Sequence, residues 1–533
     1  MKNKSKFIII ISIFVILIGL LSTFAYFTWK STNNDISFTV SGVTVELNDG
    51  KDITGANLMP TLKYTSTGNI NKPIKIRLKE ETPDTVTVNI NLKINTIDTG
   101  LKDSSFKYTL VSGNTIIKEG NFSSATNNST INLATLTNTS TTNKLTTTTS
   151  TYNLYIWIDG TMDNPSTMMN KSFDFSLDIT GTNSNMERMT LTASETIEEL
   201  DDGTTGDSGS GVYKVTHSAI PASSSATGSE IPAVTDYRYY GSNPNNYICL
   251  DMEGGSTCPD KHLYRIIGSI YEEKENTNRI KVIKATPLTD GTTNGFSWDY
   301  KVNNGNGSYD NIWATITNGN YSNSLTSGAS LMKLLNSGAW WNGTSGSYYN
   351  NSTTATNVNF TNYKLSDKAK SYVSTSRYYL GGYNSSNILT SAMYGYERGA
   401  TRYGSNPLYW DGMVGLMYPS DYGYAAGNTC VTGTDLYNYD GGCKNKDWLW
   451  MITSSDYSNG AEWLMLPRLG GNFSNDVFSV KSTGYVFPVN STGYADYYNS
   501  ARSVYSARPV FYLNSSASIS SGDGTSTAPY ILS

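Results

Sequence analysis

Four cysteines are the most reactive side chains of this 533-residue chain, and their spacing limits their chemistry. Cys249 lies close to Cys258 in the sequence, and Cys430 lies close to Cys443. Two local disulfides are favoured, because the N-terminal sequence described below indicates export into an oxidising compartment. A four-cysteine zinc site is one alternative, although neither pair has the usual spacing of about two to four intervening residues. A redox-active cysteine is the other, with two lysines just after Cys443 able to lower a thiol pKa.

Few residues are available for acid–base or nucleophilic catalysis. His217 and His262 are the two histidines of the chain, which leaves little for a serine–histidine or cysteine–histidine pair. Carboxylates could supply a glycosidase pair, but no motif singles out two of them, and aspartate is a common turn residue. The acidic residues considered for such a pair are Asp411, Asp421, Asp440, Glu462, Asp476 and Asp496. We therefore predict no catalytic residue, no metal site and no cofactor.

Aromatic and amide side chains in the C-terminal half favour recognition instead. Tryptophans concentrate there, and the stretch from Asn472 to Arg502 is dense in Asn, Tyr, Ser and Asp. Rigid aromatic rings beside adaptable polar groups are typical of binding loops. The alternatives are that the tryptophans belong to a core and that the stretch is a solvated hairpin. The residues predicted to form a ligand-binding face are Trp463, Arg468, Asn472, Asn475, Tyr497 and Tyr498.

The charge composition excludes two classes of protein. The chain has 39 Lys and Arg residues against 44 Asp and Glu residues, for a net charge of −5. A nucleic-acid-binding protein would need a basic surface, and a globally disordered chain would need more charge than the 16% of charged residues found here. We therefore expect a folded chain that has no nucleic-acid partner.

An apolar N-terminal segment predicts export and anchoring. A cluster of lysines precedes the apolar run from Phe7 to Phe27. As a helix rising about 1.5 Å per residue, this run matches a hydrocarbon core about 30 Å thick. Residues 1–30 are therefore predicted to form a transmembrane helix, with the body of the chain outside the cell. The alternative is a signal peptide cleaved after Ala25, which would release a secreted protein.

Residues 35–182 are predicted to form an all-β sandwich. Apolar and polar residues alternate strictly from Thr85 to Asn95, and shorter alternating runs occur before and after this segment. A period of two places one side of each strand on a core, and several such strands separated by turns are typical of a β-sandwich. The stretch from Ser123 to Thr151 is mostly Ser, Thr and Asn, and we interpret it as a long surface excursion.

The remaining chain is divided by composition into a linker and a large C-terminal domain. Residues 186–212 hold seven acidic residues against one basic residue, and predict an acidic flexible linker; calcium binding there is the less favoured alternative. Residues 213–533 predict a loop-rich α+β domain. Its helices are expected at 329–336 and at 366–373, with Ser366 as N-cap. Its clearest strands are expected at Trp463–Leu466, Val477–Val480 and Val510–Leu513.

The N-terminal part resembles the exported β-sandwich proteins of the TasA/camelysin type from Gram-positive bacteria. The resemblance is carried by TFAYFT (Thr23–Thr28), which ends the apolar segment, by FTVSGVTVEL (Phe38–Leu47), and by the alternating strands. That family includes fibre-forming proteins of the biofilm matrix. The resemblance therefore implies self-association through the β-sandwich as one function to be tested.

The C-terminal part resembles a bacterial surface domain of unknown function. The matching motifs are RPVFYL (Arg508–Leu513), SGDGT (Ser521–Thr525), PYIL (Pro529–Leu532) and GLMYPSDYGYA (Gly415–Ala425). The loop-rich layout also resembles the fold shared by C-type lectins and formylglycine-generating enzymes. Calcium-lectin motifs of the EPN or QPD kind are absent from the sequence, so the resemblance does not imply calcium-dependent sugar binding.

Together these expectations describe a bacterial cell-surface protein anchored in the membrane by one helix. Its β-sandwich would raise an adhesin-like C-terminal domain that binds a glycan or a protein. One alternative is an extracellular glycosidase-like enzyme, which would have a pair of catalytic groups in a deep cleft. The other is a fibre-forming matrix protein, in which edge strands pass between sandwich domains.

Overall fold

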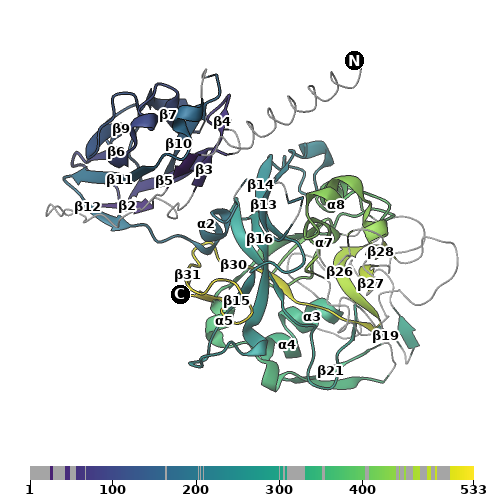
Figure 1. Ribbon diagram of the computed structural model, residues 1–533. Helices are drawn as coiled ribbons and strands as arrows, with labels where there is room; N and C mark the ends of the chain where they lie inside the picture. The colour runs from purple at the N-terminus through teal and green to yellow at the C-terminus, as the bar shows by residue number, and fades with distance from the viewer. Residues whose placement is uncertain are drawn as a thin grey trace, which may run out of the picture. The chain divides into compact units, whose positions relative to one another are not determined.

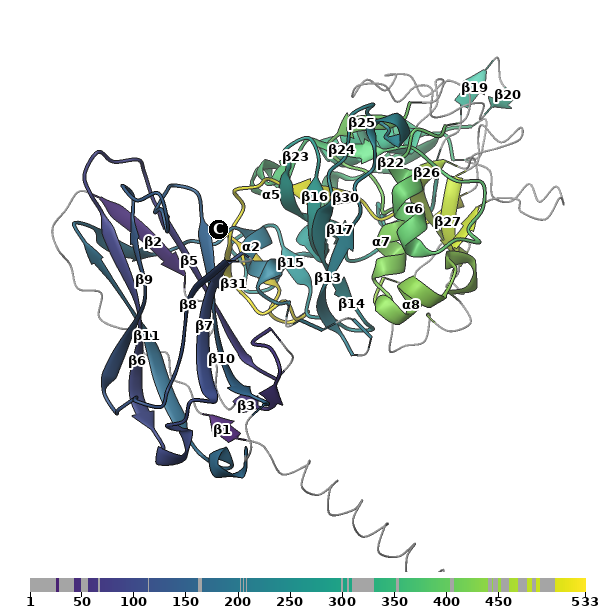
Figure 2. The ribbon, with the colours of Figure 1, turned by 90° about the horizontal axis from the view of Figure 1, so that it is seen from above.

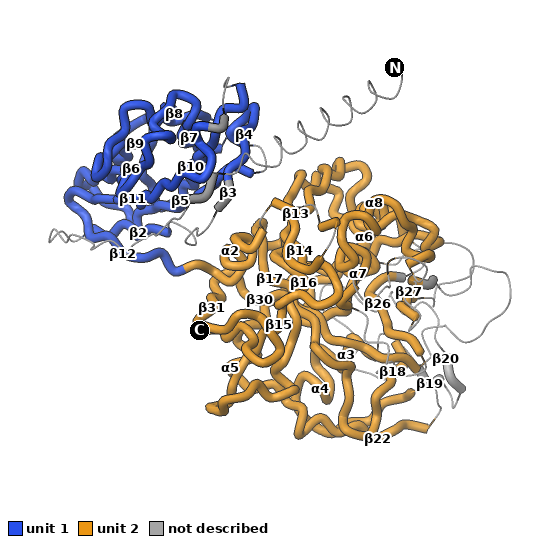
Figure 3. The backbone as a smooth tube through the Cα atoms, in the orientation of Figure 1, with its two compact units in different colours: residues 1–190 blue, residues 191–533 orange. Residues whose placement is uncertain are grey.

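The computed structural model divides the chain into two compact units, Met1–Thr190 and Leu191–Ser533 (Figure 3). The structure describes residues 25–27 and 43–533, apart from 49–55, 66–67, 114, 162–164, 202, 205, 208, 299–300, 304–305, 309–329, 351–353, 403–406, 440–442, 444–448, 452–459, 468–476, 482–485 and 489–503. Each unit has its own hydrophobic core. The predicted division into an N-terminal and a larger C-terminal domain therefore corresponds to two separately packed bodies.

The first unit is a β-sandwich, as the alternating sequence predicts (Figure 2). Its strands are β1 (Ala25–Phe27), β2 (Thr44–Asn48), β3 (Ala56–Leu58), β4 (Pro60–Thr61), β5 (Ile70–Leu78), β6 (Thr87–Ile97), β7 (Phe106–Ser112), β8 (Thr115–Asn121), β9 (Ser129–Thr137), β10 (Ser150–Asp159), β11 (Phe173–Thr182) and β12 (Asn185–Arg188). One sheet has the order β12-β2-β5-β10-β7-β8, with β4 beside β10, and the other has the order β11-β6-β9. Ile74 and Leu154 from the first sheet and Leu92 and Phe175 from the second share one buried core.

The predicted surface excursion within this unit is wrong over the length of β9. This strand pairs with β6 and buries Leu133, Ala134 and Leu136. Two neighbouring residues, Leu133 and Ala134, are both buried, because the register shifts opposite them between Ile90 and Asn91. A bulge of this kind breaks the alternation of period two that sequence patterns rely on.

The predicted flexible linker is also wrong over two of its segments. β12 pairs in parallel with β2 and so belongs to the sandwich. The helix α2 (Ala193–Glu198) follows, and its first turn is closed by a capping box between Thr192 and Glu195. Ala193 and Ile197 are buried in the core of the second unit. One of the acidic residues, Glu195, thus caps this helix. The acidic composition of residues 186–212 is therefore explained partly by a helix start and not only by exposure to solvent.

The second unit is built on one large mixed sheet (Figure 1). Its strands are β13 (Gly211–His217), β14 (Val234–Tyr240), β15 (Tyr247–Cys249), β16 (Leu263–Glu272), β17 (Thr277–Lys284), β23 (Val373–Ser374), β30 (Val510–Leu513), β31 (Ile519–Ser521) and β32 (Tyr530–Leu532). The order is β23-β30-β17-β16-β15-β32-β31, and β14 pairs with both β16 and β13. The last strands of the chain, β30 to β32, therefore complete a sheet that starts with β13, the first strand of the second unit.

Small sheets and short helices cover this central sheet. The remaining strands are β18 (Phe296–Ser297), β19 (Lys301–Asn303), β20 (Asn306–Ser308), β21 (Ser345–Tyr348), β22 (Thr356–Asn359), β24 (Ser376–Tyr379), β25 (Tyr409–Gly412), β26 (Ala461–Pro467), β27 (Val477–Lys481), β28 (Val486–Pro488) and β29 (Val504–Tyr505). The helices are α3 (Ser330–Asn336), α4 (Ala339–Asn342), α5 (Asp367–Ser371), α6 (Thr390–Glu397), α7 (Pro419–Tyr424) and α8 (Asn428–Gly433). The predicted α+β character is confirmed, including α3, the strands β26, β27 and β30, and α5 with Ser366 as its N-cap.

Both predicted disulfides are present, Cys249–Cys258 and Cys430–Cys443. The first joins the end of β15 to the loop before β16, and the second joins α8 to the loop that follows it. All four cysteines are used in these bonds. The zinc and redox-active alternatives for these residues are therefore wrong, since both require free thiols.

Most of the predicted membrane anchor, residues 1–24, lies outside the described residues. The last part of the apolar run, Ala25–Phe27, forms β1, which pairs with β3. Among the described residues, no helix combines the length and apolarity needed to cross a membrane. The transmembrane helix and the alternative signal peptide thus both remain predictions.

Candidate functional site

A cluster of charged side chains lies in the interior of the second unit, at the start of α7. Asp421 of α7 accepts hydrogen bonds from Lys281 Nζ at 2.5 Å and from Arg238 Nη1 at 3.1 Å. Arg238 also binds Asp236 at 2.7 Å, and Asp236 lies 2.9 Å from His217 Nε2. β13, β14 and β17 supply these partners, and every side chain in the cluster is buried. Because each carboxylate faces at least one cation, the cluster has the pairing that buried charges require.

A second buried pair adjoins the same helix start. Glu397, the last residue of α6, accepts hydrogen bonds from the backbone N–H and the hydroxyl of Ser420, at 2.9 and 2.6 Å. Arg398 lies 3.1 Å from the Glu397 carboxylate, and its guanidinium stacks 3.5 Å from the ring centre of Tyr394. Burial raises the pKa of Glu397 to about 7, against the opposing charge of Arg398. The pKa of His217 is lowered by burial, and Asp236 offsets part of this effect.

The raised pKa of Glu397 predicts a loss of stability as the pH rises. The ordinary value of 4.5 applies to the unfolded chain and about 7 to the folded one. The folded state therefore retains a proton that the unfolded state has released, and stability falls by about 3 kcal/mol between these two pH values. Chemical denaturation at about pH 5 and about pH 8 measures this change. In the Glu397→Gln variant, which cannot ionise, the corresponding decrease should be absent; an equal decrease in both proteins would contradict the assignment.

The acidic residues considered for a glycosidase pair are used differently from one another. Asp421 and Glu462 are buried in ion pairs with Lys281 and Arg508. Asp411 lies nearer the surface, paired with Arg377 at 2.9 Å. The three others, Asp440, Asp476 and Asp496, lie outside the described residues. The structure thus brings none of the three described candidates together as an open pair of carboxyl groups.

A small group of potential ligand atoms, which the sequence did not single out, lies beside the first disulfide. One ligand atom from each of Asp251, Glu253 and His262 lies within 4.8 Å of the others. Glu253 accepts from Lys261 at 2.8 Å and contacts His262 Nε2 at 3.1 Å, while Asp251 accepts from the hydroxyl of Ser366 at 2.5 Å. These contacts tie the disulfide loop to the start of α5. A cation bound here would have to displace Lys261, so the observed role of the cluster is to hold this loop.

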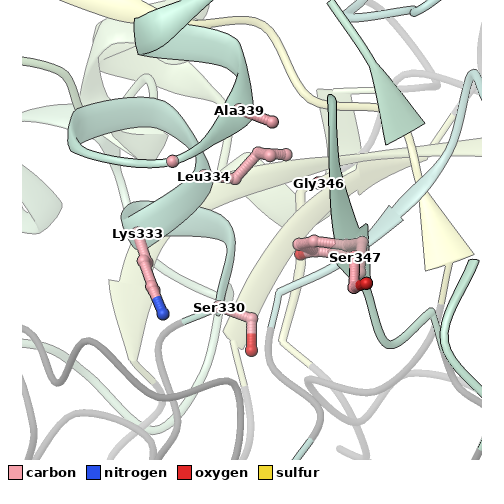
Figure 4. A pocket seen from close by; sticks show the side chains of 8 residues that line it. Ser330, Lys333, Leu334, Ala339, Gly346 and Ser347 are labelled. Carbon is pink, nitrogen blue, oxygen red and sulfur yellow. The ribbon is translucent and has the colours of Figure 1, made fainter. Parts of the chain in front are cut away.

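A cavity of about 140 Å³ opens between α3, α4 and β21 (Figure 4). The residues that line it are Ser330, Lys333, Leu334, Gly338, Ala339, Gly346, Ser347 and Tyr348. Lys333 and Ser330 project from α3, and Ser347 lies across from them on β21 (Figure 4). Among these lining residues, Lys333 alone carries a charge, and burial lowers its pKa. The cavity therefore suits a small group with an apolar face and a hydroxyl or anionic end.

The structure overturns the predicted role of Trp463 as a ligand-binding residue. This side chain is fully buried, and its indole N–H donates to the backbone oxygen of Phe296 at 2.7 Å. Trp463 lies within a run of buried residues in β26, Ala461–Leu466, which alternation would not have placed entirely inside. Two apolar faces on one short strand identify a strand buried on both sides.

The other predicted binding residues lie outside the described residues: Arg468, Asn472, Asn475, Tyr497 and Tyr498. The described strands that flank them nevertheless meet at one place. Pro467, which ends β26, pairs with Val477, which begins β27, and the next residue of β27, Phe478, pairs with Pro488, which ends β28. The chain thus leaves the sheet β26-β27-β28 towards residues 468–476 and towards residues 489–503 at the same end.

Comparison with known proteins adds no relative to these observations. No family model matches the chain, and no curated protein and no solved structure shows a significant match to it.

Proposed function

We propose that this chain is a bacterial cell-surface protein whose C-terminal unit is an adhesin-like binding domain. In this proposal residues 1–30 anchor the chain, the β-sandwich raises the second unit above the membrane, and that unit binds a glycan or a protein. The same proposal gives the first unit a TasA/camelysin-like role as a stalk, and the second a C-type-lectin-like plan of loops on a rigid frame.

The shared exit point beside β26, β27 and β28 is the observation that carries the binding proposal. It gives residues 468–476 and 489–503, which are rich in Asn, Tyr and Ser, a common base on the domain. The strand β26 of this base is fixed in the domain, because its Trp463 is fully buried and Arg508 binds its Glu462 through two contacts at 2.7 and 2.9 Å. Variable polar and aromatic loops on a fixed scaffold are the usual design of a recognition surface.

Two further features support an exported recognition role. The two disulfides are each local, and such bonds persist in oxidising compartments outside the cytoplasm. The cavity beside Lys333 supplies a place for a small hydroxyl-bearing or anionic group of the ligand. The proposal therefore gives the second unit two candidate contact regions for a ligand. One is formed by residues 468–476 and 489–503, and the other is the cavity beside Lys333.

The tyrosines at positions 497 and 498 provide the direct test of the binding face. Tyr497→Ala and Tyr498→Ala should each weaken binding by about 2 kcal/mol or more, because truncating a hot-spot aromatic removes a buried contact with the ligand. The melting temperature should stay nearly unchanged, because the proposal assigns these side chains to the ligand face and not to the core, and substitutions outside a core change stability little. The ligand is first identified on glycan and host-protein arrays, and affinities are then measured by calorimetry with the whole chain.

Tyr396, an exposed residue of α6, is the matched control, and Tyr396→Ala should leave both affinity and melting temperature unchanged. If the variants at positions 497 and 498 unfold while the folded fraction still binds normally, the two tyrosines are core residues. Hydrolysis of a glycan by the purified chain would instead favour the glycosidase-like alternative, and assembly into fibres through the sandwich would favour the matrix alternative.

The anchoring proposal predicts a defined pattern of proteolysis on intact cells. Protease added outside should digest the two described units and leave the N-terminal segment with the membrane, because the lysine-flanked end stays inside. Immunoblotting with tags at the two ends of the chain measures this. Protection of the C-terminal tag would show that the body is not exported, and release of an undigested body lacking residues 1–25 would show that the segment is cleaved.

A further inference from the structure

Among the described residues of the second unit, a buried lysine and a buried carboxylate are in direct contact between β17 and α7. Lys281 Nζ lies 2.5 Å from Asp421 Oδ2, and the two side chains are 1% and 2% exposed. An ordinary charge-assisted N–H···O bond has a length of about 2.7–2.9 Å. The amine and the carboxyl group are therefore already in contact, at a place that solvent does not reach.

Aromatic rings enclose the pair and keep water away from it. Lys281 Nζ lies 4.5 Å from the ring centre of Tyr418 and 5.3 Å from that of Tyr512, and both rings are buried. The Lys107–Asp159 pair of the sandwich has the same 2.5 Å separation, but its side chains are 34% and 17% exposed. The two pairs therefore have the same separation and differ in burial. This difference matters because water opposes the formation of an amide from an amine and an acid.

Two hydrogen-bond donors are placed where they would assist an attack by the Lys281 amine on the carboxyl carbon of Asp421. Arg238 Nη1 donates to Oδ1 at 3.1 Å, where negative charge would develop, and the backbone N–H of Tyr418 donates to Oδ2 at 3.0 Å. Donors fixed on such an oxygen stabilise the tetrahedral intermediate of acyl transfer. Two groups held in contact also react with an effective concentration of about 10⁵–10⁸ M.

The protonation of the pair can change without altering the charge of the core. Burial lowers the pKa of Lys281, whereas for Asp421 the charges of Lys281 and Arg238 outweigh burial and hold its pKa below the usual value. Transfer of one proton from Nζ to the carboxylate gives a neutral amine and a neutral acid. The net charge of the pair is zero before and after this transfer, and Arg238 keeps Asp236 as a second buried partner.

We propose that Lys281 and Asp421 condense into an isopeptide bond that covalently links β17 to α7. The lone pair of Lys281 Nζ attacks Asp421 Cγ, and a new C–N bond forms as the bond from Cγ to Oδ2 breaks. Oδ2 leaves as water with its own proton and one proton from the amine. Oδ1 becomes the amide carbonyl and keeps its hydrogen bond from Arg238. No electrons are transferred to another molecule, so the reaction needs no oxidant, reductant or cofactor.

The bond would fasten two distant parts of the second unit. Lys281 and Asp421 are 140 residues apart in the sequence, and both disulfides lie outside the span between them. The link would hold the charged cluster at the start of α7 even when the disulfides are reduced. It would also give a surface-exposed protein a cross-link that reductants cannot open.

Mass spectrometry of the purified full-length chain tests this directly. After N-terminal sequencing fixes the start of the chain and the disulfides are reduced, the intact mass should be lower than the sequence mass by one water molecule. Trypsin should leave the peptide 280–284 uncut at Lys281 and joined to the peptide 403–444, which contains Asp421. An intact mass equal to that of the sequence would overturn the proposal.

Substitutions then assign the missing water to this pair. Lys281→Arg keeps a cation beside Asp421 and should restore the full sequence mass, whereas Lys107→Arg in the half-exposed sandwich pair should leave the deficit in place. A deficit that persists in Lys281→Arg, or that maps to a single linear peptide, as an aspartyl succinimide would, contradicts the proposal. The wild-type peptide map decides the question even if the Lys281→Arg chain does not fold.

Discussion

Replacing Trp463 by alanine should lower the free energy of unfolding by about 3–5 kcal/mol, the range observed when a large aromatic side chain is removed from a core. Trp463 is fully buried, packs 4.7 Å from the ring of Tyr505, and donates its indole N–H to Phe296. The substitution leaves a cavity and an unpaired backbone oxygen, and both add to the cost. Urea denaturation of the whole chain, followed through the unfolding of the second unit, measures the change.

Two variants separate packing from any direct role of Trp463 in binding. Trp463→Phe keeps most of the apolar volume and loses the N–H, so it should cost about 1–3 kcal/mol. Trp341→Ala removes a tryptophan that is only partly buried, beside Lys370, and should cost less than Trp463→Ala. If Trp463→Ala leaves stability unchanged and abolishes binding, the original assignment of this residue to the ligand face is restored.

Removing the Arg508 side chain should destabilise the second unit by about 3–5 kcal/mol, the usual cost of leaving one partner of a buried ion pair without the other. Arg508 and Glu462 are 0% and 1% exposed, and the guanidinium binds the carboxylate at 2.7 and 2.9 Å. Arg508→Met retains most of the apolar volume of the arginine and isolates the effect of its charge. Thermal and urea unfolding of this variant provide the measurement.

A double substitution tests whether the cost arises from the stranded carboxylate. Arg508→Met combined with Glu462→Gln should recover part of the lost stability, because neither member of this pair then leaves an unpaired charge in the interior. The more exposed Arg377–Asp411 pair, at 19% and 27% exposure, is the matched control, and Arg377→Met should cost about 0–1 kcal/mol. Equal losses for Arg508→Met and Arg377→Met would show that burial does not set the strength of these pairs.

Such variants also bear on how the second unit can support recognition. The buried pairs join elements that are far apart in sequence, as Arg238 of the strand β14 does with Asp421 of the helix α7. If the proposed binding surface is built on this frame, it should change shape little when it meets a ligand, which would reduce the entropy lost on binding. Stability measurements on the frame and affinity measurements on residues 468–503 therefore examine separate parts of one design.

Local patterns in the sequence were sufficient for much of the fold. The alternation in β6 from Thr87 to Asn95 depends only on the period of a strand, and the N-cap Ser366 depends only on the first turn of α5. The prediction missed a strand and a helix where contacts between distant parts of the chain decided the local structure. β9 escaped prediction because a bulge at its own Leu133 disrupts its pattern, and α2 because its acidic composition was typical of a linker.

The sequence by itself determined the β-sandwich, the α+β character of the second unit and the pairing of neighbouring cysteines, because each follows from residues close together in the chain. Only the tertiary structure decided which polar residues are buried and with whom they pair. Lys281 and Asp421 meet across 140 residues, and Trp463 enters a core to which strands from several sheets contribute. Nothing local in a sequence encodes such a meeting, because burial and charge pairing are created by the packing of distant elements. That packing places Asp421, a residue type common in turns, in the interior as a carboxylate paired with Lys281 and Arg238.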